Sequence, residues 1–151
     1  MIVLGIDPGA SGAIVALSMD VEQRTVTMFK LSQTEADIAV WLEGLCDQVM
    51  PHAFIERVHS MPKQGVSSSF KFGQSYGFLR GLLCGFAIPF EEVSPQKWQR
   101  EMGCLTGGKK NVSKQKAQQL FPREKITHAT ADALLIAEYG RRVLKQRYGA
   151  T

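Results

Sequence analysis

The alternation of apolar and polar positions predicts a chain that mixes strands and helices. Mostly apolar, uncharged runs bounded by turn residues are typical of buried strands, and the first run ends at the turn signal Asp7-Pro8-Gly9. We expect five strands, at about residues 2–6, 12–17, 25–29, 53–56 and 87–93. An opening three-strand meander followed by alternating helices and strands predicts an α/β fold with a five-stranded mixed sheet flanked by helices.

Apolar residues spaced three and four apart predict the helices. The first is expected to run from a cap at Ser32 or Thr34 to a stop at Pro51. A short helix is expected over residues 114–120, after a loop rich in Gly, Lys, Ser and Asn, and a last helix over residues 127–144.

The most regular helical pattern covers residues 67–86. One face carries an apolar seam at 4-3-4-3 spacing: Phe72, Tyr76, Leu79, Leu83 and Phe86. The nearly opposite face carries a glycine ridge, defined as Gly73, Gly77, Gly81 and Gly85. Each mid-helix glycine costs roughly 0.5–1 kcal/mol relative to alanine, so the ridge predicts a close approach by another backbone. We expect a soluble helix buried on two sides, with the seam on the sheet and the ridge on another helix, of this chain or of a partner subunit.

Composition favours one globular domain over residues 1–151, with 44% hydrophobic and 21% charged residues. No uncharged stretch reaches the ~20 residues of a membrane span, and the first residues lack a basic or Arg/Ser-rich targeting pattern. We therefore expect a cytoplasmic location and no membrane partner. The widely spaced Cys46, Cys84 and Cys104 are expected to be buried apolar residues in a reducing compartment.

The net charge of +4 is unevenly distributed along the chain. Residues 1–50 carry two basic and seven acidic side chains, whereas residues 101–151 carry ten basic and four acidic ones. A basic later part of the chain suits a polyanionic partner such as a nucleic acid. A solvated charged surface explains the same pattern equally well.

Four residues are candidates for metal chemistry. Asp7 stands where an apolar strand breaks into a turn, and Glu56 ends the apolar run 53–55. His128 and Asp132 lie four residues apart, on one face at the start of the last helix. Each has an ordinary explanation, as a turn residue, a surface ion pair or a helix start. Their joint order favours a shared site.

Carboxylates at the ends of buried strands are costly unless they are paired or bind a metal. Carboxylate oxygens suit Mg²⁺ or Mn²⁺, and an imidazole nitrogen moves the preference toward Mn²⁺. Two such ions ~3.5–4 Å apart could stabilise the attacking and leaving oxygens of a phosphodiester displacement. These residues therefore predict a two-metal site and no small-molecule cofactor.

Three sequence blocks contain the three candidate carboxylates: Gly-Ile-Asp-Pro-Gly-Ala-Ser-Gly-Ala at 5–13, Ile-Glu at 55–56 and Ala-Asp-Ala-Leu-Leu-Ile-Ala at 131–137. Together they resemble the motifs of the RuvC-type Holliday-junction resolvases of the RNase H-like superfamily. Further motifs, at 70–77, 94–98 and 132–140, are closest to the branch that contains plastid and some phage resolvases. The resemblance covers about residues 2–140 and implies an RNase H-like fold.

The resemblance also implies roles for individual residues. Asp7 and Glu56 match the first two catalytic carboxylates of the family, and Asp132 matches the last. His128 is similar to the histidine that the plastid-like branch uses as a metal ligand. The bacterial pattern has one more aspartate, three residues before the last carboxylate, where this chain has Ala129.

Partners follow from the same resemblance. Lys114 matches a basic residue that approaches the scissile phosphate in the family. Family members are homodimers that present two active sites to opposite strands of a four-way DNA junction. We therefore expect a homodimer and a junction partner, with the protein at the nucleoid or in the cytoplasm of an infected cell.

Other residues are candidates for DNA contacts. His59 occupies about the position where related resolvases stack an aromatic ring on bases, although an ordinary loop histidine explains it as well. Six lysines are candidate phosphate contacts: Lys63, Lys71, Lys97, Lys109, Lys110 and Lys116. Trp41 and Trp98 are expected in the core.

We expect a metal-dependent endonuclease that resolves four-way junctions by paired symmetric nicks, leaving 5′-phosphate and 3′-hydroxyl ends. One alternative is a junction-binding protein without cleavage, which the Ala129 departure permits. Another is a nuclease that acts on RNA or RNA–DNA hybrids. A phosphate-binding ATPase on a similar sheet is a distant alternative, because the chain is short for two lobes.

Overall fold

The structure is a computed structural model that describes residues 1–20, 22, 24–59, 65–105, 107 and 109–149. These form one sheet in the order β3-β2-β1-β4-β5. The strands are β1 (Ile2–Asp7), β2 (Ala13–Ser18), β3 (Val26–Lys30), β4 (His52–Glu56) and β5 (Phe90–Val93). The β1–β2 and β2–β3 pairs are antiparallel, whereas β1–β4 and β4–β5 are parallel. The predicted five-stranded mixed sheet is confirmed.

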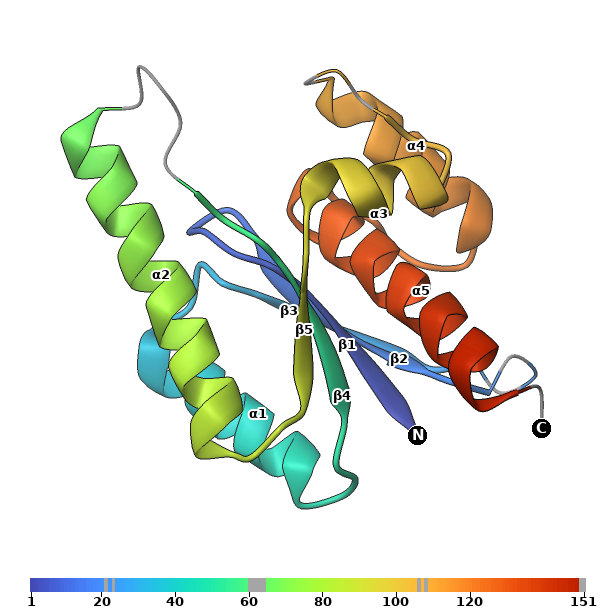
Figure 1. The fold of residues 1–151 in the computed structure, drawn as a ribbon, viewed down its shortest axis with the longest axis horizontal. Helices are drawn as coiled ribbons and strands as arrows, with labels where there is room; N and C mark the ends of the chain where they lie inside the picture. The colour runs from blue at the N-terminus through green and yellow to red at the C-terminus, as the bar shows by residue number, and fades with distance from the viewer. Residues whose placement is uncertain (21, 23, 60–64, 106, 108, 150–151) are drawn as a thin grey trace.

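Helices cover both faces of this sheet (Figure 1). They are α1 (Glu35–Cys46), α2 (Val66–Gly85), α3 (Pro95–Glu101), α4 (Lys110–Leu120) and α5 (His128–Tyr148). The α1 and α2 helices lie on one face, and α3, α4 and α5 on the other. Within the described residues, no helix is long and apolar enough to cross a membrane.

The α5 helix lies directly on the sheet because two glycines leave room for it. A Cβ atom at Gly5 of β1 would stand 2.1 Å from the carbonyl oxygen of Ala133. A Cβ atom at Gly140 of α5 would stand 2.3 Å from Cδ2 of Phe54 on β4. Only glycine fits at such distances, so these two contacts fix the height and register of α5 over β1 and β4.

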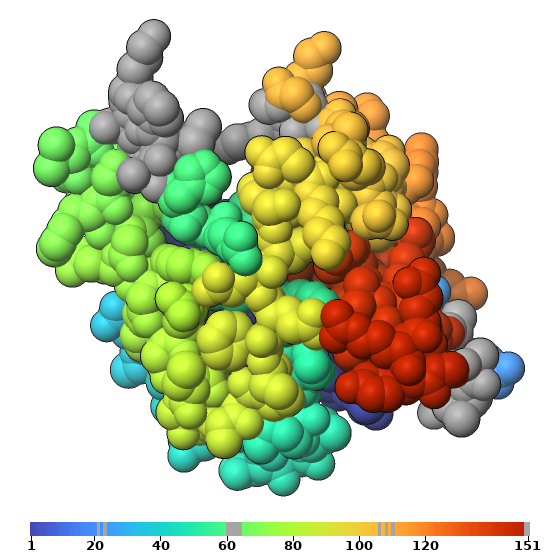
Figure 2. Space-filling view, viewed as in Figure 1, coloured from blue at the N-terminus to red at the C-terminus, as the bar shows by residue number. Residues whose placement is uncertain are grey.

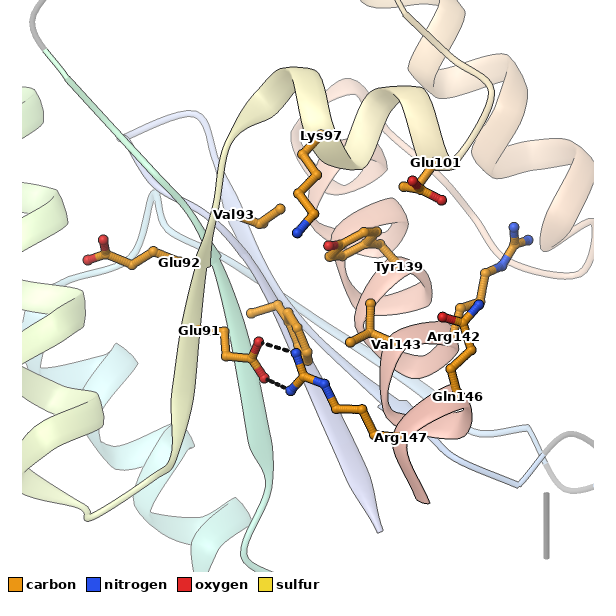
Figure 3. Close-up of a pocket in the computed structure, with 11 residues that line it drawn as sticks. Glu91, Glu92, Val93, Lys97, Glu101, Tyr139, Arg142, Val143, Gln146 and Arg147 are labelled. Atoms are coloured by element: carbon orange, nitrogen blue, oxygen red, sulfur yellow. Dashed lines mark hydrogen bonds and ion pairs between the residues drawn. The ribbon is translucent and has the colours of Figure 1, made fainter. Parts of the chain in front are cut away.

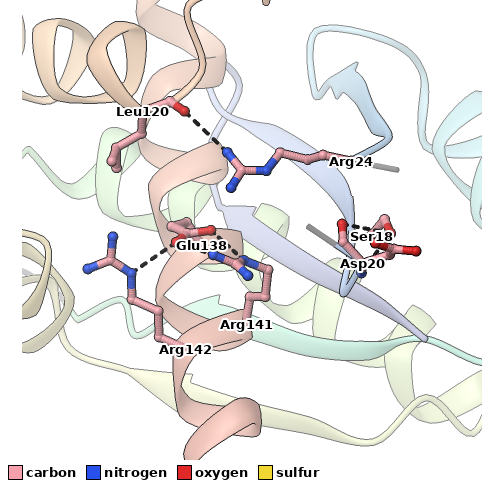
Figure 4. Close-up of polar contacts among 7 residues, drawn as sticks. All are labelled: Ser18, Asp20, Arg24, Leu120, Glu138, Arg141 and Arg142. Carbon is pink, nitrogen blue, oxygen red and sulfur yellow. Dashed lines mark hydrogen bonds and ion pairs between the residues drawn. The ribbon is translucent and has the colours of Figure 1, made fainter. Parts of the chain in front are cut away.

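A buried ion network strengthens the α5 layer (Figure 4). Glu138 is 3% exposed and accepts hydrogen bonds of 2.7 Å from Nε and Nη2 of Arg141 and of 2.9 Å from Nε of Arg142. Burial raises the pKa of Glu138, but the hydrogen bonds from the two arginines outweigh burial and hold the pKa below its ordinary value. On the same side of the molecule, Arg24 donates to the carbonyl oxygen of Leu120 at 3.2 Å and so ties the β2–β3 connection to the end of α4.

The α2 helix is packed much less completely. In its apolar seam Leu79 and Leu83 are buried, whereas Phe72, Tyr76 and Phe86 are half-buried. All four glycines of the ridge are exposed, and a Cβ atom on any of them meets no described atom within 4 Å. The expectation that the ridge packs on another helix of this chain is therefore wrong. Packing on a partner subunit stays a prediction.

Element boundaries differ from the predicted ones for local reasons. The fifth strand begins at Phe90 because Ala87 has φ 54°, a left-handed conformation that turns the chain after α2. The first helix begins after Thr34, which forms a capping box with Asp37, and ends at Cys46, well before Pro51.

The segment after β5 contains helical structure that the periodicity did not predict. The α3 helix starts where the Ser94 hydroxyl accepts from the backbone N–H of Lys97 at 3.3 Å, with Pro95 in its first turn. The α4 helix begins at Lys110, so the loop expected up to residue 114 is helical from 110 onward.

The cysteines have three different environments. Cys104 is buried, Cys46 is half-buried and Cys84 is exposed on α2. The expectation that all three are buried is therefore wrong for Cys46 and Cys84.

Candidate active site

Two of the predicted carboxylates lie side by side at one end of the sheet. Strands β1 and β4 pair in parallel with Ile6 opposite Ile55, so Asp7 and Glu56 are the next neighbours in register. Side chains alternate between faces along a strand, and Gly5 of β1 faces α5. Asp7 and Glu56 are therefore both on the face that α5 covers.

Asp132 reaches the same end of the sheet from α5. The backbone of Ala133 lies over Gly5, which places the first turn of α5 beyond it, toward Asp7. Thr127 begins this helix, in a reciprocal capping pair with Thr130. The charge of Asp132 acts on the carboxyl group of Glu56, in agreement with this placement. Three carboxylates from distant parts of the sequence thus converge.

Glu56 has a strongly perturbed environment. The pKa of Glu56 is raised from 4.5 to about 7: burial raises it most, the hydrogen bond from Trp98 lowers it, and the negative charge of Asp132 raises it. The Trp98 indole N–H donates to Oε2 of Glu56 at 2.7 Å. A partly desolvated carboxyl group beside a second carboxylate is an environment that a cation would stabilise.

The chemistry of these donors fits a divalent metal ion. Asp7, Glu56 and Asp132 offer the oxygen ligands that Mg²⁺ and Mn²⁺ prefer. His128 is exposed at the first position of α5, on the helix face that carries Asp132. Within the described residues, no group of three His, Cys, Asp or Glu side chains is placed so that it could hold a metal ion. The donor types of these residues therefore fit a divalent cation, whereas their arrangement around one, including the role of His128, stays a prediction.

The turn after Asp7 is anchored to α2. Gly9 has φ 111°, and a Cβ atom there would stand 2.7 Å from the ring of Phe72. Its backbone N–H donates to the Ser75 hydroxyl at 3.2 Å. The glycine in this turn is thus required both by backbone conformation and by the contact with α2. The α2 helix consequently helps to hold the loop that follows Asp7.

Lys116 lies near Gly103 and Cys104, just after α3. Its Nζ is 3.8 Å from where a Cβ atom on Gly103 would be. Burial raises the pKa of Cys104, Asp132 raises it further and Lys116 lowers it, so both charges act at this thiol. Lys114 is two residues earlier on α4 and therefore on a nearly opposite side of that helix. Of the two lysines, Lys116 is the one whose charge acts on Cys104 together with that of Asp132, and the role of Lys114 stays a prediction.

The carboxylate end of the sheet is bordered by exposed elements. Figure 2 shows the first turns of α2 in green on one side and α3 with the start of α4 in yellow and orange on the other, with residues just after β4 between them. His59 is exposed at this end, and Lys109 is exposed at the N-cap of α4.

The remaining predicted DNA contacts are spread over other surfaces. Lys97 is exposed and lines a cavity of about 520 Å³ between β5 and α5, near Tyr139 (Figure 3). Lys71 lines a cavity of about 490 Å³ on the α2 side. Lys63 lies outside the described residues, and the side chain of Lys110 is not described. Of the described lysines, Lys97 and Lys71 therefore line cavities on opposite sides of the sheet.

The sequence prediction missed the contact of Trp98. This residue is fully buried, as expected of a core tryptophan, yet its N–H group reaches Glu56. Trp41 is only half-buried and stacks on Phe29 with ring centroids 5.1 Å apart. The sequence around Trp98 gave no signal for this contact. The contact between Trp98 and Glu56 depends on how β5 pairs with β4, which the local sequence does not reveal.

Comparisons with known proteins identify the fold. No family model and no curated protein sequence matches the chain. Among solved structures, Thermus thermophilus RuvC in complex with a Holliday junction substrate matches with a TM-score of 0.66 at 16% identity, over 99% of this chain and 97% of that one. A second T. thermophilus RuvC structure matches with a TM-score of 0.64 at 16% identity, over 97% and 96%. The chain has the RuvC-type, RNase H-like fold that the resemblance predicted.

Proposed function

We propose that this chain is a metal-dependent endonuclease that resolves four-way DNA junctions. One observation carries the proposal: Asp7 and Glu56 end adjacent parallel strands in register, on the face over which α5 brings Asp132. The fold shared with T. thermophilus RuvC, including the RuvC solved with a Holliday junction substrate, supports the same function.

The residues of this chain divide the work between them. Asp7, Glu56 and Asp132 hold Mg²⁺ or Mn²⁺, with His128 as a further ligand. Two such ions, when bound, supply an activated water nucleophile and charge stabilisation at the leaving oxygen, and cleavage leaves 5′-phosphate and 3′-hydroxyl ends. Lys116 adds a positive charge beside Asp132, where a phosphate of the backbone is attracted.

Paired nicks require two active sites, and we propose that the glycine ridge of α2 forms the contact between two copies. The ridge is open to a partner backbone along the whole helix. Val66 and Phe70, on the exposed side of α2, are 88% and 66% exposed, which is unusual for apolar side chains of this size. Close helix packing on a second copy would bury both and offset the helix-destabilising cost of four glycines.

Substitution on the ridge tests the dimer. Gly77→Leu is expected to give a monomer in sedimentation equilibrium, whereas the wild type sediments as a dimer. Gly44→Leu is the matched control, because Gly44 is an exposed glycine of α1 that also has open space around it. A Gly77→Leu protein that remains as dimeric as the control contradicts this interface.

The function is tested by cleavage of a mobile four-way DNA junction with Mg²⁺ and then Mn²⁺. We expect symmetric nicks in two opposite strands, and a loss of at least about 100-fold in the Asp132→Asn variant, as expected for removal of a metal ligand or its support. Linear duplex DNA and an RNA–DNA hybrid of the same sequence are the matched substrates.

Each other outcome favours a different protein. Tight junction binding without cleavage in either metal favours a recognition protein. Preferential cleavage of the hybrid favours a ribonuclease on the same fold. Either result contradicts the proposed resolvase.

A further inference from the structure

We infer that Trp98 is a positioning residue whose indole N–H fixes the orientation of the Glu56 carboxylate at the proposed cleavage site. This inference rests on the proposed function and adds to it a residue outside the carboxylate set.

The contact is short and buried. The Trp98 Nε1 atom lies 2.7 Å from Oε2 of Glu56, a distance typical of a hydrogen bond to a charged oxygen. Trp98 is 0% exposed, within the apolar cluster that includes Met102 and Phe121. Because the ring is enclosed, its N–H points in one fixed direction, and the carboxylate must adapt to it.

The position of the indole is set by the same strand pairing that places Glu56. Glu56 pairs with Val93 of β5, and the backbone N–H of Arg57 donates to the carbonyl oxygen of Val93 at 2.8 Å. The chain then enters α3 at its cap, Ser94, and one helical turn brings Trp98 back over the end of β4. The donor and the acceptor are therefore held by one continuous, hydrogen-bonded path.

A tryptophan suits this task chemically. An indole has a donor and no acceptor, so a buried Trp98 can satisfy its N–H only with an acceptor such as a carboxylate oxygen. By holding Oε2, it restricts rotation of the carboxyl group about its terminal bond. The carboxylate is thereby presented toward Asp7 and Asp132 in one orientation, as groups around a metal ligand commonly do.

The contact itself is tested by NMR without any reaction. The chain has two tryptophans, so a ¹⁵N-labelled sample gives two indole N–H signals, and Trp41→Phe identifies the signal of Trp98. Glu56→Gln is expected to move the Trp98 signal and to leave the Trp41 signal in place. Addition of Mg²⁺ to the otherwise unchanged protein is expected to move the Trp98 signal as well. A Trp98 signal that responds to neither change overturns the inference.

The role is tested by removing one N–H group and nothing else. In the Trp41→Phe background, Trp98 is replaced during expression by β-(3-benzothienyl)alanine, which has the shape of tryptophan with sulfur in place of N–H. We expect a folded protein that binds Mn²⁺ about 10-fold or more weakly in the absence of DNA, with a similar loss of junction cleavage. Trp41→Phe with natural tryptophan at 98 is the control. Unchanged Mn²⁺ affinity overturns the inference.

The two levels of failure are distinguishable. If the control binds Mn²⁺ and cleaves, and the sulfur analogue does so equally well, the positioning role is wrong and the proposed function stands. If the control neither binds Mn²⁺ nor cleaves, the proposed function is wrong and the positioning role falls with it, whatever the indole signals do.

Discussion

The two long helices on opposite faces of the sheet show two uses of glycine. On the α5 side, the carbonyl oxygen of Ala133 occupies the space where Gly5 lacks a side chain, and the ring of Phe54 occupies the corresponding space at Gly140. Each of these glycines thus permits a close contact within the chain. On the α2 side, the ridge glycines face open space and create no contact with described residues. The α5 layer is thus complete in one chain, whereas α2 has a surface shaped for something outside it.

The same contrast separates their roles at the candidate site. The α5 helix carries Asp132 and is held rigidly over β1, which suits a residue that must sit within ångströms of Asp7 and Glu56. The α2 helix touches the site through the turn at Gly9, by way of Phe72 and Ser75. A partner that packs on α2 would therefore reach the site through this turn.

The largest expected effect comes from breaking the buried ion network of α5. Glu138→Gln is expected to lower the free energy of unfolding by about 3–5 kcal/mol, because it leaves Arg141, 7% exposed, without a buried countercharge. Atom Nη1 of Arg141 already has no hydrogen-bond partner in the described part of the chain. Urea unfolding measures the loss. The control is Glu91→Gln, which removes the more exposed ion pair between Glu91 of β5 and Arg147 of α5. It is expected to lower the free energy of unfolding by about 1 kcal/mol or less. Equal losses for both would contradict the expected difference between a buried and a more exposed ion pair.

The next effect tests the close approach of α5 to the sheet. Gly5→Ala is expected to destabilise the fold by about 3 kcal/mol or to prevent folding, since the new methyl group would overlap the backbone of Ala133 and Ala137. Thermal unfolding followed by circular dichroism measures this, with Gly44→Ala as the control in open space. A Gly5→Ala protein as stable as the wild type would mean that α5 does not lie where the structure has it.

The pH dependence of the metal-free protein tests the environment of Glu56. Its pKa is raised from an ordinary value of 4.5 to about 7, so between these values the folded state binds more protons than the unfolded state. Stability in the presence of a chelator should therefore fall by about 2–3 kcal/mol as the pH rises from about 4.5 to 7. Glu56→Gln should remove this part of the fall, and Mg²⁺ should offset it in the unchanged protein. If Glu56→Gln leaves the pH dependence of stability unaltered, the raised pKa of Glu56 is contradicted.

The smallest effect addresses the glycine ridge and has opposite signs in the two states. Gly77→Ala should stabilise the isolated chain by about 0.5–1 kcal/mol, because alanine favours the helix and its methyl group meets no described atom. The same change should weaken the proposed dimer, since the methyl group would separate the two backbones. Unfolding at concentrations below and above dimerisation measures both. Destabilisation at low concentration would show that the ridge is already packed within the chain.

Local patterns predicted most of the sheet but not the details of the α3 region. Mostly apolar, uncharged runs located β1, β2 and β4 closely, because each strand is bounded by turn residues. The α3 helix was missed because its seven residues bury only Trp98, too few for a helical period. The start of β5 was misplaced because an alanine, Ala87, adopts the left-handed conformation that a sequence pattern assigns to glycine.

The candidate site was predictable as a set of residues and not as a geometry. Asp7, Glu56 and Asp132 were recognisable from their joint order along the chain and from the family resemblance, and the structure brings them to one end of the sheet. The contacts of Trp98 and Lys116 were not predictable, because both depend on how α3 and α4 fold back over that end. Such long-range contacts are a consequence of the tertiary fold, with no signature in the neighbouring sequence.

The outer strand β5 has a further consequence for the behaviour of the protein at high concentration. Its two adjacent glutamates are paired to arginines on opposite faces of the sheet, Glu91 to Arg147 of α5 and Glu92 to Arg80 of α2. A short border strand with charged side chains on both faces is a poor template for strand addition from another molecule. The protein can therefore expose this border of its sheet in a crowded cell without aggregating through it.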